Sequence, residues 1–421
     1  AFQTFHIDFD SIKDAADGGA TTGIPPADEI WDFTTGQRTM ILDYLNMHYG
    51  SYGMVFEAGP PAIPFTSSSI TLNKGFGAGS EGVDFRNLDG DDGAGINVIS
   101  LMKFDGTMEP VGGWDPAAVA MATANAVAHE AEHLMGARHH DKASPLNTGL
   151  GGGVFPGDFS PAYTGPTDAF ESPGTFTALH AGGTLSYGAL TTPKVVSERV
   201  VPRLVMGGPT GDDHFVEDMD PENHEVDKAM IVPTPGFTVP YPLRGTPEDP
   251  DLTPLFIAGK MAAVKGTLDT PGVTGGFKSE YYEFFGEAGE KWTIEAMSLI
   301  LPDPDGDGPR YPDGLDMGIA LLAGPGSPLG AGTVIPYYST TALTDDDDDG
   351  FLGATLFDII LPYSGSYVIE VASAAPFHGG VGKDGMSSGS FELFMYSAKP
   401  VPEPTTLALV GLAGLTLLRR R

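Results

Sequence analysis

Cysteine is absent from this chain of 421 residues, basic residues are few, and no apolar run is long enough to span a bilayer. Without cysteine the chain can form neither disulfide bonds nor thiolate metal sites. Only 22 lysines and arginines stand against 56 aspartates and glutamates, which gives a formal net charge of -34. So acidic a surface repels nucleic acid and anionic lipid, and neither is expected as a partner.

The apolar fraction, 41% of residues, is that of a folded protein, and the length allows two or three domains. In the first half, residues 5–9 alternate as in a strand, and residues 39–48 carry apolar side chains at helical spacing. Residues 69–72 and 96–102 predict further strands, ahead of an alanine-rich helix. With β-type runs in the second half, the predicted fold class is α+β.

Residues 129–139 read HEAEHLMGARH, a complete HExxHxxGxxH string. Two histidines four apart on a helix project from one face, so His129 and His133 can reach the same metal ion. Gly136 allows a left-handed turn, which can bring His139 to that ion as a third ligand. Three nitrogen ligands leave one zinc position open, as in a catalytic site. Surface histidines on an alanine-rich helix would explain the first pair, but not the added glycine and third histidine at this spacing.

Glu130 follows the first of these histidines and is not itself expected to be a ligand. Its carboxylate can activate a zinc-bound water as general base and pass the proton to a leaving amine. The helix that would carry it has favourable signals at its start. Asp115 is a candidate N-cap, Pro116 suits the first helical position, and residues 117–128 are rich in alanine.

The string resembles the zinc-binding signature of the metzincin metallopeptidases. The resemblance implies a metzincin-like catalytic domain over residues 1–225, with zinc held by the three histidines above a methionine turn. Residues 204–208, LVMGG, look like that turn, with Met206 as the supporting methionine; an ordinary buried turn would have the same pattern. Some metzincins add a tyrosine ligand two residues after the methionine. That position is Gly208 here, so no such ligand is expected.

Three acidic clusters with nearby glycines are candidate calcium sites, since closely spaced carboxylates can wrap Ca²⁺. The second cluster has alternating aspartates, as at the start of a calcium loop, but lacks the glutamate that completes an EF-hand. The alternative for each cluster is a solvated turn or a loop tip kept soluble by charge. The candidate ligands are Asp89, Asp91 and Asp92, then Asp303, Asp305 and Asp307, and finally Asp345, Asp347 and Asp349.

Residues 226–256 are acidic and proline-rich, which predicts a linker. Residues 257–398 contain short β-type runs separated by Gly, Pro and Asp, which predicts an antiparallel β-sandwich. The phrase PYSGSYVI at residues 362–369 resembles the pre-peptidase C-terminal (PPC) domain of secreted bacterial peptidases. That resemblance implies a module that accompanies a peptidase and is not itself catalytic. The runs are residues 281–285, 291–295, 317–322, 356–361, 367–371 and 391–396.

Residues 399–421 form a tail with three parts: Pro-Glu-Pro at 402–404, an apolar run at 405–418 and three arginines at 419–421. The run has 14 residues, fewer than the roughly 20 that span a bilayer as a helix. Together the parts resemble the PEP-CTERM sorting signal of Gram-negative bacteria. The resemblance implies recognition by an exosortase and export to the cell surface or extracellular matrix, with only transient membrane contact. A plain membrane anchor is the alternative.

Three functions are compatible with these features. An exported zinc endopeptidase would cleave protein or peptide substrates through a zinc-activated water, with Glu130 as general base. A structural or adhesive matrix protein, self-assembling and with a vestigial or stabilising zinc site, would also suit the acidic sandwich and the tail. A zinc hydrolase acting on other bonds fits less well, because the third histidine and the methionine turn belong to the peptidase pattern. The expected cofactors are zinc and calcium, the expected partners are substrate and sorting machinery, and a homo-oligomer is compatible with each function.

Overall fold

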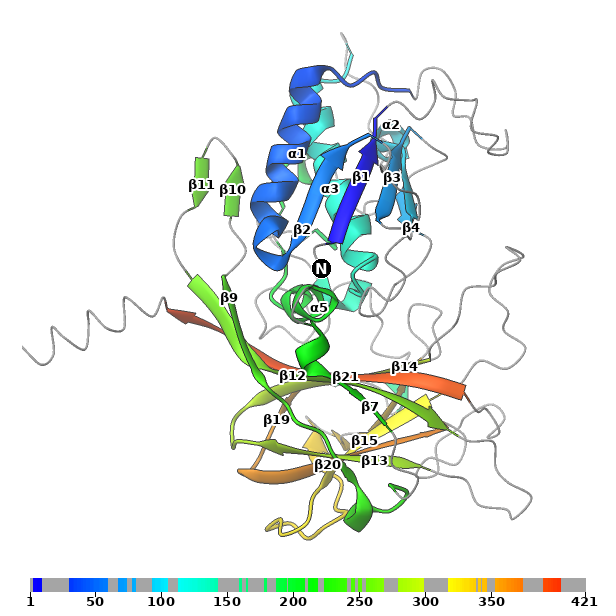
Figure 1. The fold of residues 1–421 in the computed structure, drawn as a ribbon, viewed down its shortest axis with the longest axis vertical. Helices are drawn as coiled ribbons and strands as arrows, with labels where there is room; N and C mark the ends of the chain where they lie inside the picture. The colour runs from blue at the N-terminus through cyan, green and yellow to red at the C-terminus, as the bar shows by residue number, and fades with distance from the viewer. Residues whose placement is uncertain are drawn as a thin grey trace, which may run out of the picture.

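The fold was analysed in a computed structural model of the chain (Figure 1). Helices and a small sheet make up its N-terminal part, and strands dominate its C-terminal part. The structure describes residues 3–9, 30–59, 67–73, 78–80, 93–104, 113–142, 159–160, 164–165, 178–179, 187–194, 196–208, 211–218, 223–240, 244–246, 249–251, 255–268, 279–298, 317–337, 340–341, 343–346, 353–373 and 389–402.

A sheet of five described strands lies at the centre of the N-terminal part, in the order β2-β1-β3-β5-β4 (Figure 1). Four of them are parallel, and β4 pairs antiparallel with β5 at one edge. Phe5 and Ile7 of β1 are fully buried, as the alternation of apolar residues predicts. The strands are β1 (Gln3–Asp8), β2 (Met54–Ala58), β3 (Ser68–Leu72), β4 (Ala78–Ser80) and β5 (Gly93–Ile96).

Two helices, α1 (Thr35–Tyr49) and α3 (Pro116–His133), lie side by side on this sheet (Figure 1). α1 packs against β2, and α3 packs against β4 and β5. α1 begins with a capping box. The Thr34 side chain accepts a hydrogen bond from the backbone N–H of Gln37, and the Gln37 side chain accepts one from the backbone N–H of Thr34. Within the described part of the chain, no helix has the length and apolar character needed to cross a membrane.

The strand predicted over residues 96–102 is wrong. β5 ends at Ile96, and the chain continues as helix α2 (Val98–Phe104). The change of structure occurs at Asn97, whose side chain accepts a hydrogen bond from the Ser100 backbone N–H at 3.0 Å. An asparagine in this position is a favourable N-cap, so it starts a helix within an apolar run that periodicity alone assigns to a strand.

Asn125 joins α3 to its surroundings through buried hydrogen bonds. Its amide donates to the carbonyls of Leu190 and Thr192, at 2.8 and 2.9 Å. Its oxygen lies 3.3 Å from the hydroxyl of Tyr44 in α1, which also donates to the Lys194 carbonyl at 2.7 Å. Because most of these polar groups are shielded from water, the network holds α3 in a defined position relative to α1 and residues 190–194.

Replacement of Asn125 by alanine is expected to destabilise the fold by about 2 kcal/mol, because the buried Leu190 carbonyl and the part-buried Thr192 carbonyl lose their shared donor. Equilibrium unfolding in denaturant measures the loss. The matched control is Thr123→Val in the same helix. The Thr123 hydroxyl donates to the Val119 carbonyl, which keeps its helical hydrogen bond, so the control is expected to cost about 1 kcal/mol or less. Equal losses for the two variants would contradict the role assigned to Asn125.

The C-terminal part contains a sheet of 12 described strands with the path β7-β12-β21-β14-β19-β18-β15-β20-β13-β8. The path bends into two layers, with β12, β21 and β14 above β15, β20 and β13 in Figure 1. Between them lie fully buried aromatic side chains, among them Trp292, Phe284 and Tyr367, which is consistent with a β-sandwich. The main strands are β12 (Leu255–Leu268), β13 (Glu280–Gly286), β14 (Lys291–Ser298), β15 (Met317–Ala323), β18 (Leu343–Asp346), β19 (Gly353–Ile360), β20 (Gly365–Ser373) and β21 (Gly389–Pro402).

Further short elements complete the described structure. Strands β7 (Phe215–Glu217) and β8 (Met230–Ile231) lie at the two ends of the large sheet, while β6 (Phe159–Ser160) and β9 (Gly236–Pro240) branch from its path. The remaining elements are the paired strands β10 (Arg244–Thr246) and β11 (Asp249–Asp251), the pair β16 (Pro336–Tyr337) and β17 (Thr340–Thr341), helices α4 (Tyr187–Leu190) and α5 (Val200–Gly207), and the 3₁₀ turns η2 (Gly50–Tyr52), η4 (His139–Lys142), η7 (Gly211–His214) and η8 (Val226–Lys228).

All six β-type runs of the predicted sandwich fall on strands, namely β13, β14, β15, β19, β20 and β21. Residues 226–256, in contrast, are not the free linker that their composition predicts. β9 pairs antiparallel with β12, and β8 pairs with β13. β7, within residues 1–225, also pairs with β12. Segments flanked by proline suit the ends of a sheet, because half of the backbone groups of an edge strand have no partner in the sheet. A proline-rich composition is therefore compatible with a short edge strand as well as with a linker.

Strands β12 and β21 bury both of their faces. In β12, Met261 packs into the apolar cluster of the N-terminal part, and the next residue, Ala262, packs into the sandwich core. In β21, Phe394 packs into the apolar cluster of the N-terminal part, and Met395 packs into the sandwich core. Because neighbouring residues of a strand point to opposite sides, one layer of the sandwich is enclosed between its own core and the N-terminal part. The two parts therefore share an apolar interface.

Of the aspartates predicted to bind calcium, Asp345 is the one that lies among the described residues. Its backbone is in β18, opposite Gly318 of β15. Calcium binding at these clusters stays a prediction. The other candidates, which lie outside the described residues, are Asp89, Asp91, Asp92, Asp303, Asp305, Asp307, Asp347 and Asp349.

Candidate metal centre

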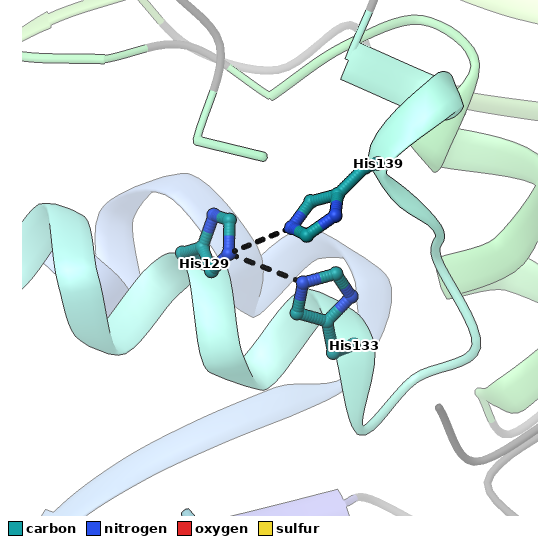
Figure 2. Close-up of side chains that lie close together, drawn as sticks. All are labelled: His129, His133 and His139. Carbon is teal, nitrogen blue, oxygen red and sulfur yellow. Dashed lines mark hydrogen bonds between the residues drawn. The ribbon is translucent and has the colours of Figure 1, made fainter. Parts of the chain in front are cut away.

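The end of α3 carries the first two histidines of the motif. The helix starts as predicted, with Pro116 in its first turn and the Asp115 side chain accepting a hydrogen bond from a first-turn N–H. Most of the helix is buried, which its small alanine side chains permit. One turn apart at its end, His129 and His133 project to the same side, toward His139 (Figure 2). The predicted use of one helix face by both histidines is confirmed.

A left-handed turn brings the third histidine back toward the helix. Gly136 has φ 93°, a conformation that glycine adopts without steric cost. The Ala137 N–H then donates to the Glu132 carbonyl at 2.9 Å, which closes the helix end. The 3₁₀ turn η4 follows, and His139 is its first residue. The predicted function of Gly136 as a left-handed stop is confirmed.

Backbone carbonyls fix the orientation of two of the imidazole rings. The Nδ1 atom of His129 lies 2.9 Å from the Ala178 carbonyl oxygen, and that of His133 lies 2.7 Å from the Ala137 carbonyl oxygen. A carbonyl can only accept a hydrogen bond, so each Nδ1 carries the hydrogen. In the neutral ring this leaves a lone pair on Nε2. Histidines that bind metals are oriented by the same kind of hydrogen bond.

The Nε2 atoms converge. Those of His129 and His133 are 3.1 Å apart, and those of His129 and His139 are 3.4 Å apart, along the dashed lines of Figure 2. Two nitrogen ligands of one tetrahedral zinc ion, each about 2.0–2.1 Å from it, would be about 3.3 Å apart. The three ligand atoms all lie within 4.8 Å of one another. The donor set and its spacing therefore fit a zinc ion.

The charge state of the rings also fits a cation. Burial lowers the pKa of His129 well below its ordinary value, and the charges that His133 and His139 would carry lower it further. A neutral His129 whose hydrogen is on Nδ1 presents a bare Nε2 to the similarly oriented Nε2 of His133. Two lone pairs at hydrogen-bond distance repel each other unless a proton or a metal ion lies between them. Since burial disfavours the additional proton, a metal ion satisfies this arrangement best.

The two glutamates of the motif have different surroundings, although both are buried. Glu132 accepts a hydrogen bond from the Tyr49 hydroxyl of α1 at 2.6 Å. Burial raises the pKa of Glu132 to about 8, even though this hydrogen bond acts in the opposite direction. Glu132 thus belongs to the contact between α1 and α3. Glu130 directly follows His129, which is the position that the motif assigns to proton transfer.

The predicted methionine turn is corrected to the end of a helix. Residues 204–207 belong to α5, and Met206 is buried in its last turn. The chain leaves the helix at Gly208, where a Cβ would lie 2.9 Å from the carbonyl oxygens of both Leu204 and Tyr52. Glycine at this position is therefore required by the close approach of two backbone segments. Support of the metal site by Met206 stays a prediction.

Substitution of Gly136 by alanine is expected to lower the stability by about 1–2 kcal/mol, because a Cβ is unfavourable in the left-handed conformation. Zinc affinity should fall as well, since His139 follows this turn. Gly289 is a matched control, as it has φ 82° in the sandwich and space for a Cβ. Gly289→Ala should cost similar stability and leave zinc affinity unchanged. Thermal unfolding with and without zinc separates the two effects, and equal zinc-dependent shifts in the two variants would argue against the role of Gly136.

Two groups of the site have no signature in the sequence, namely the carbonyls of Ala178 and Ala137. A backbone carbonyl is present at every residue, so only the folded chain identifies those that orient a histidine. Ala137 lies inside the motif, four residues after His133, and a helix-end turn could have suggested it. Ala178 lies in the long stretch between residues 141 and 206, for which the sequence predicts no fold.

Comparison with known families identifies the tail. The PEP-CTERM protein-sorting motif matches residues 400–421. Gram-negative bacteria export proteins with this motif and associate them with the cell surface, so the chain is an exported, surface-directed protein. The motif also indicates recognition by exosortase-type sorting machinery. No metallopeptidase family matches the chain, and no curated protein does.

Among solved structures, the chain is similar to PliG of Aeromonas hydrophila, a periplasmic inhibitor of g-type lysozyme. The two are 18% identical over 33% of this chain and 86% of PliG, with a TM-score of 0.19. The chain is also similar to the pre-peptidase C-terminal domain of a collagenase from Bacillus anthracis. That domain is 17% identical over 33% of this chain and 88% of its own length, with a TM-score of 0.18. These similarities are too weak to indicate a function for this chain.

Proposed function

We propose that the protein is an exported zinc-dependent endopeptidase. The observation that carries the proposal is the convergence of three Nε2 atoms, two of them in tautomers set by backbone carbonyls. Three nitrogen ligands leave coordination positions for water and substrate, unlike a closed structural site. The buried Glu130 beside this set supplies the carboxylate that hydrolysis needs. Export by the sorting tail is compatible with action on proteins outside the cell.

When bound, zinc would polarise the scissile carbonyl as a Lewis acid and favour the ionisation of water. The residues of the chain perform the remaining steps. His129, His133 and His139 hold the ion through their Nε2 atoms, and the carbonyls behind the first two rings keep these atoms directed at it. The Glu130 carboxylate accepts a proton from the attacking water and then donates it to the amine that leaves.

The surrounding fold offers a place for an extended substrate. β4 is the edge strand of the N-terminal sheet and lies against α3, the helix that carries His129 and His133. An edge strand has backbone N–H and C=O groups available on one side, and a peptide can add to it as a further strand. Apart from the additional helix α2, the order of strand, helix and strands before α3 is the one that the metzincin resemblance implies, which supports the same proposal.

Metal analysis and substrate cleavage test the proposal together. The full-length protein, purified with zinc and calcium present, is expected to contain stoichiometric zinc and to cleave an unfolded protein. A strong chelator should abolish cleavage, zinc should restore it, and His133→Ala should lose the metal. Zinc-replete protein that cleaves none of a broad peptide library would overturn the peptidase assignment. Ordered self-assembly of that inactive protein would instead support the structural or adhesive role in the extracellular matrix.

A further inference from the structure

We propose that the sandwich is part of the metal centre, because Glu295 of β14 positions the turn that carries the third ligand, His139. The inference rests on the proposed zinc site and extends it to a residue that is 157 positions away from Arg138 in sequence. Glu295 touches neither the ion nor the substrate in this assignment. It acts through two arginines of the N-terminal part.

Residues 138–141 form a closed turn around His139. The Arg138 backbone N–H donates to the Asp141 carboxylate at 3.0 Å, and the Asp141 N–H donates to the Arg138 carbonyl at 2.8 Å. His139 lies between these two residues, so its backbone follows any displacement of the turn. The turn has two ionic side chains, one at each end, through which the rest of the protein can hold it.

Ion pairs link both ends of the turn to Glu295, one directly and the other through Arg203. The Arg138 guanidinium pairs with one oxygen of the Glu295 carboxylate at 3.1 Å. Asp141 lies 3.6 Å from Nε of Arg203, and Arg203 pairs with the other oxygen of Glu295. Arg203 also lies over the Phe394 ring of β21, at 4.1 Å from its centroid. One carboxylate of the sandwich is therefore the common anchor for the turn.

The burial of these groups makes the anchor strong. Arg138 and Arg203 are 2% and 4% exposed, and Glu295 and Asp141 are fully buried. Buried ion pairs are screened little by solvent, and loss of one partner leaves an uncompensated charge in the interior. The Arg138 guanidinium is accommodated beside Gly353 of β19, where a Cβ would lie 3.5 Å from its Nη1. The sandwich thus provides the charge that pairs with the arginine preceding His139.

A second ion pair crosses the same interface, and it joins Asp358 to an arginine outside residues 138–141. Arg199 pairs with Asp358 of β19 at 2.6 Å, and both side chains are buried. Asp358→Asn removes the same unit of charge as Glu295→Gln, from the same sandwich and the same interface. The pair of variants therefore distinguishes a general loss of interface stability from a specific effect on His139.

The test compares zinc affinity in the full chain, measured by competition with a chromophoric chelator, and thermal unfolding of the metal-free proteins. Glu295→Gln is expected to lower zinc affinity by about 10–100-fold, the usual effect of removing a group that supports a ligand. Asp358→Asn is expected to lower the unfolding temperature and to leave zinc affinity within about twofold of the unmodified protein. Arg138→Met, which keeps the length of the side chain, removes the link to the turn while Arg203 still pairs with Glu295. It should weaken zinc binding as Glu295→Gln does and provides the readout if that variant does not fold.

Equal zinc affinity of Glu295→Gln, Arg138→Met and Asp358→Asn would overturn the inference while leaving the zinc site intact. If the unmodified protein bound no more zinc than His133→Ala, the proposed function would fail, and the inference with it. A loss of zinc affinity confined to Glu295→Gln and Arg138→Met supports the sandwich as a component of the metal centre.

Discussion

Replacement of Glu130 by glutamine is expected to lower the rate of peptide hydrolysis by about 10²–10⁴-fold, the usual contribution of a positioned general base. Glutamine has the same shape, but its amide cannot accept the proton of the attacking water. The three histidines are unchanged, so the variant should bind zinc with the affinity of the unmodified protein. Turnover of an unfolded substrate and zinc titration measure the two quantities on one sample.

The second glutamate of the motif is the matched control. Glu132→Gln alters a residue two positions along α3, but an amide oxygen can still accept the hydrogen bond from the Tyr49 hydroxyl. The side chain is buried in the contact between α1 and α3 and keeps its hydrogen bond as glutamine, so hydrolysis should change by less than about threefold. Full activity of Glu130→Gln, or equal losses in the two variants, would remove Glu130 from the mechanism.

The convergence of the three histidines could be predicted because its geometry is local. His129 and His133 are related by helical spacing, and Gly136 and His139 follow the helix end by three and six residues, so eleven residues of sequence contain the three histidines. The start of α3 could be predicted for the same reason, because Asp115 caps the helix through a short-range hydrogen bond and the following proline has a backbone conformation that suits the first turn. Local rules of this kind hold in almost any fold.

The strands of the sandwich were predictable for a similar reason, but their partners were not. Short runs such as those of β13 and β20 are identified by composition and turn residues. Nothing in Phe391 to Tyr396 indicates that one face of β21 packs in the sandwich and the other against the N-terminal part. A continuous apolar run is compatible with burial on both faces, but it does not predict which part of the protein covers each face.

The ionic groups at the interface were the least predictable feature. Composition assigns charged residues to the surface, because burial of a charge is costly unless a partner compensates it. Arg138 stands within the zinc motif and Glu295 within a strand, and each looks like a solvated residue until the fold brings them together. The excess of acidic residues makes a buried carboxylate such as Glu295 still harder to recognise, because it is one of 56 aspartates and glutamates in the sequence.

Removal of the carboxylate of Asp358 is expected to have a large effect on stability, about 3–5 kcal/mol for Asp358→Asn. Burial is the largest single influence on the pKa of Arg199 and lowers it, but attraction by Asp358, the hydrogen bond to Asp358 and smaller contributions from Tyr396 and Asp141 together raise the pKa, so the arginine stays charged. Without its partner, that charge remains buried. The aspartate itself has φ 52° in β19, opposite an irregularity between Trp292 and Ile294 of β14. Asparagine tolerates this left-handed conformation, so the substitution changes the charge and leaves the backbone in place.

Two further variants separate charge from backbone strain at this position. Asp358→Gly relieves the left-handed conformation and removes the carboxylate; if the ion pair dominates, it should destabilise the protein nearly as much as Asp358→Asn. The double variant Arg199→Met with Asp358→Asn removes both charges, and it should recover part of the lost stability because no unpaired ion remains. Equilibrium unfolding in denaturant gives the free energies. A double variant that is less stable than either single one would mean that the ion pair is not the source of the stabilisation, whereas recovery would assign it to charge compensation inside the interface.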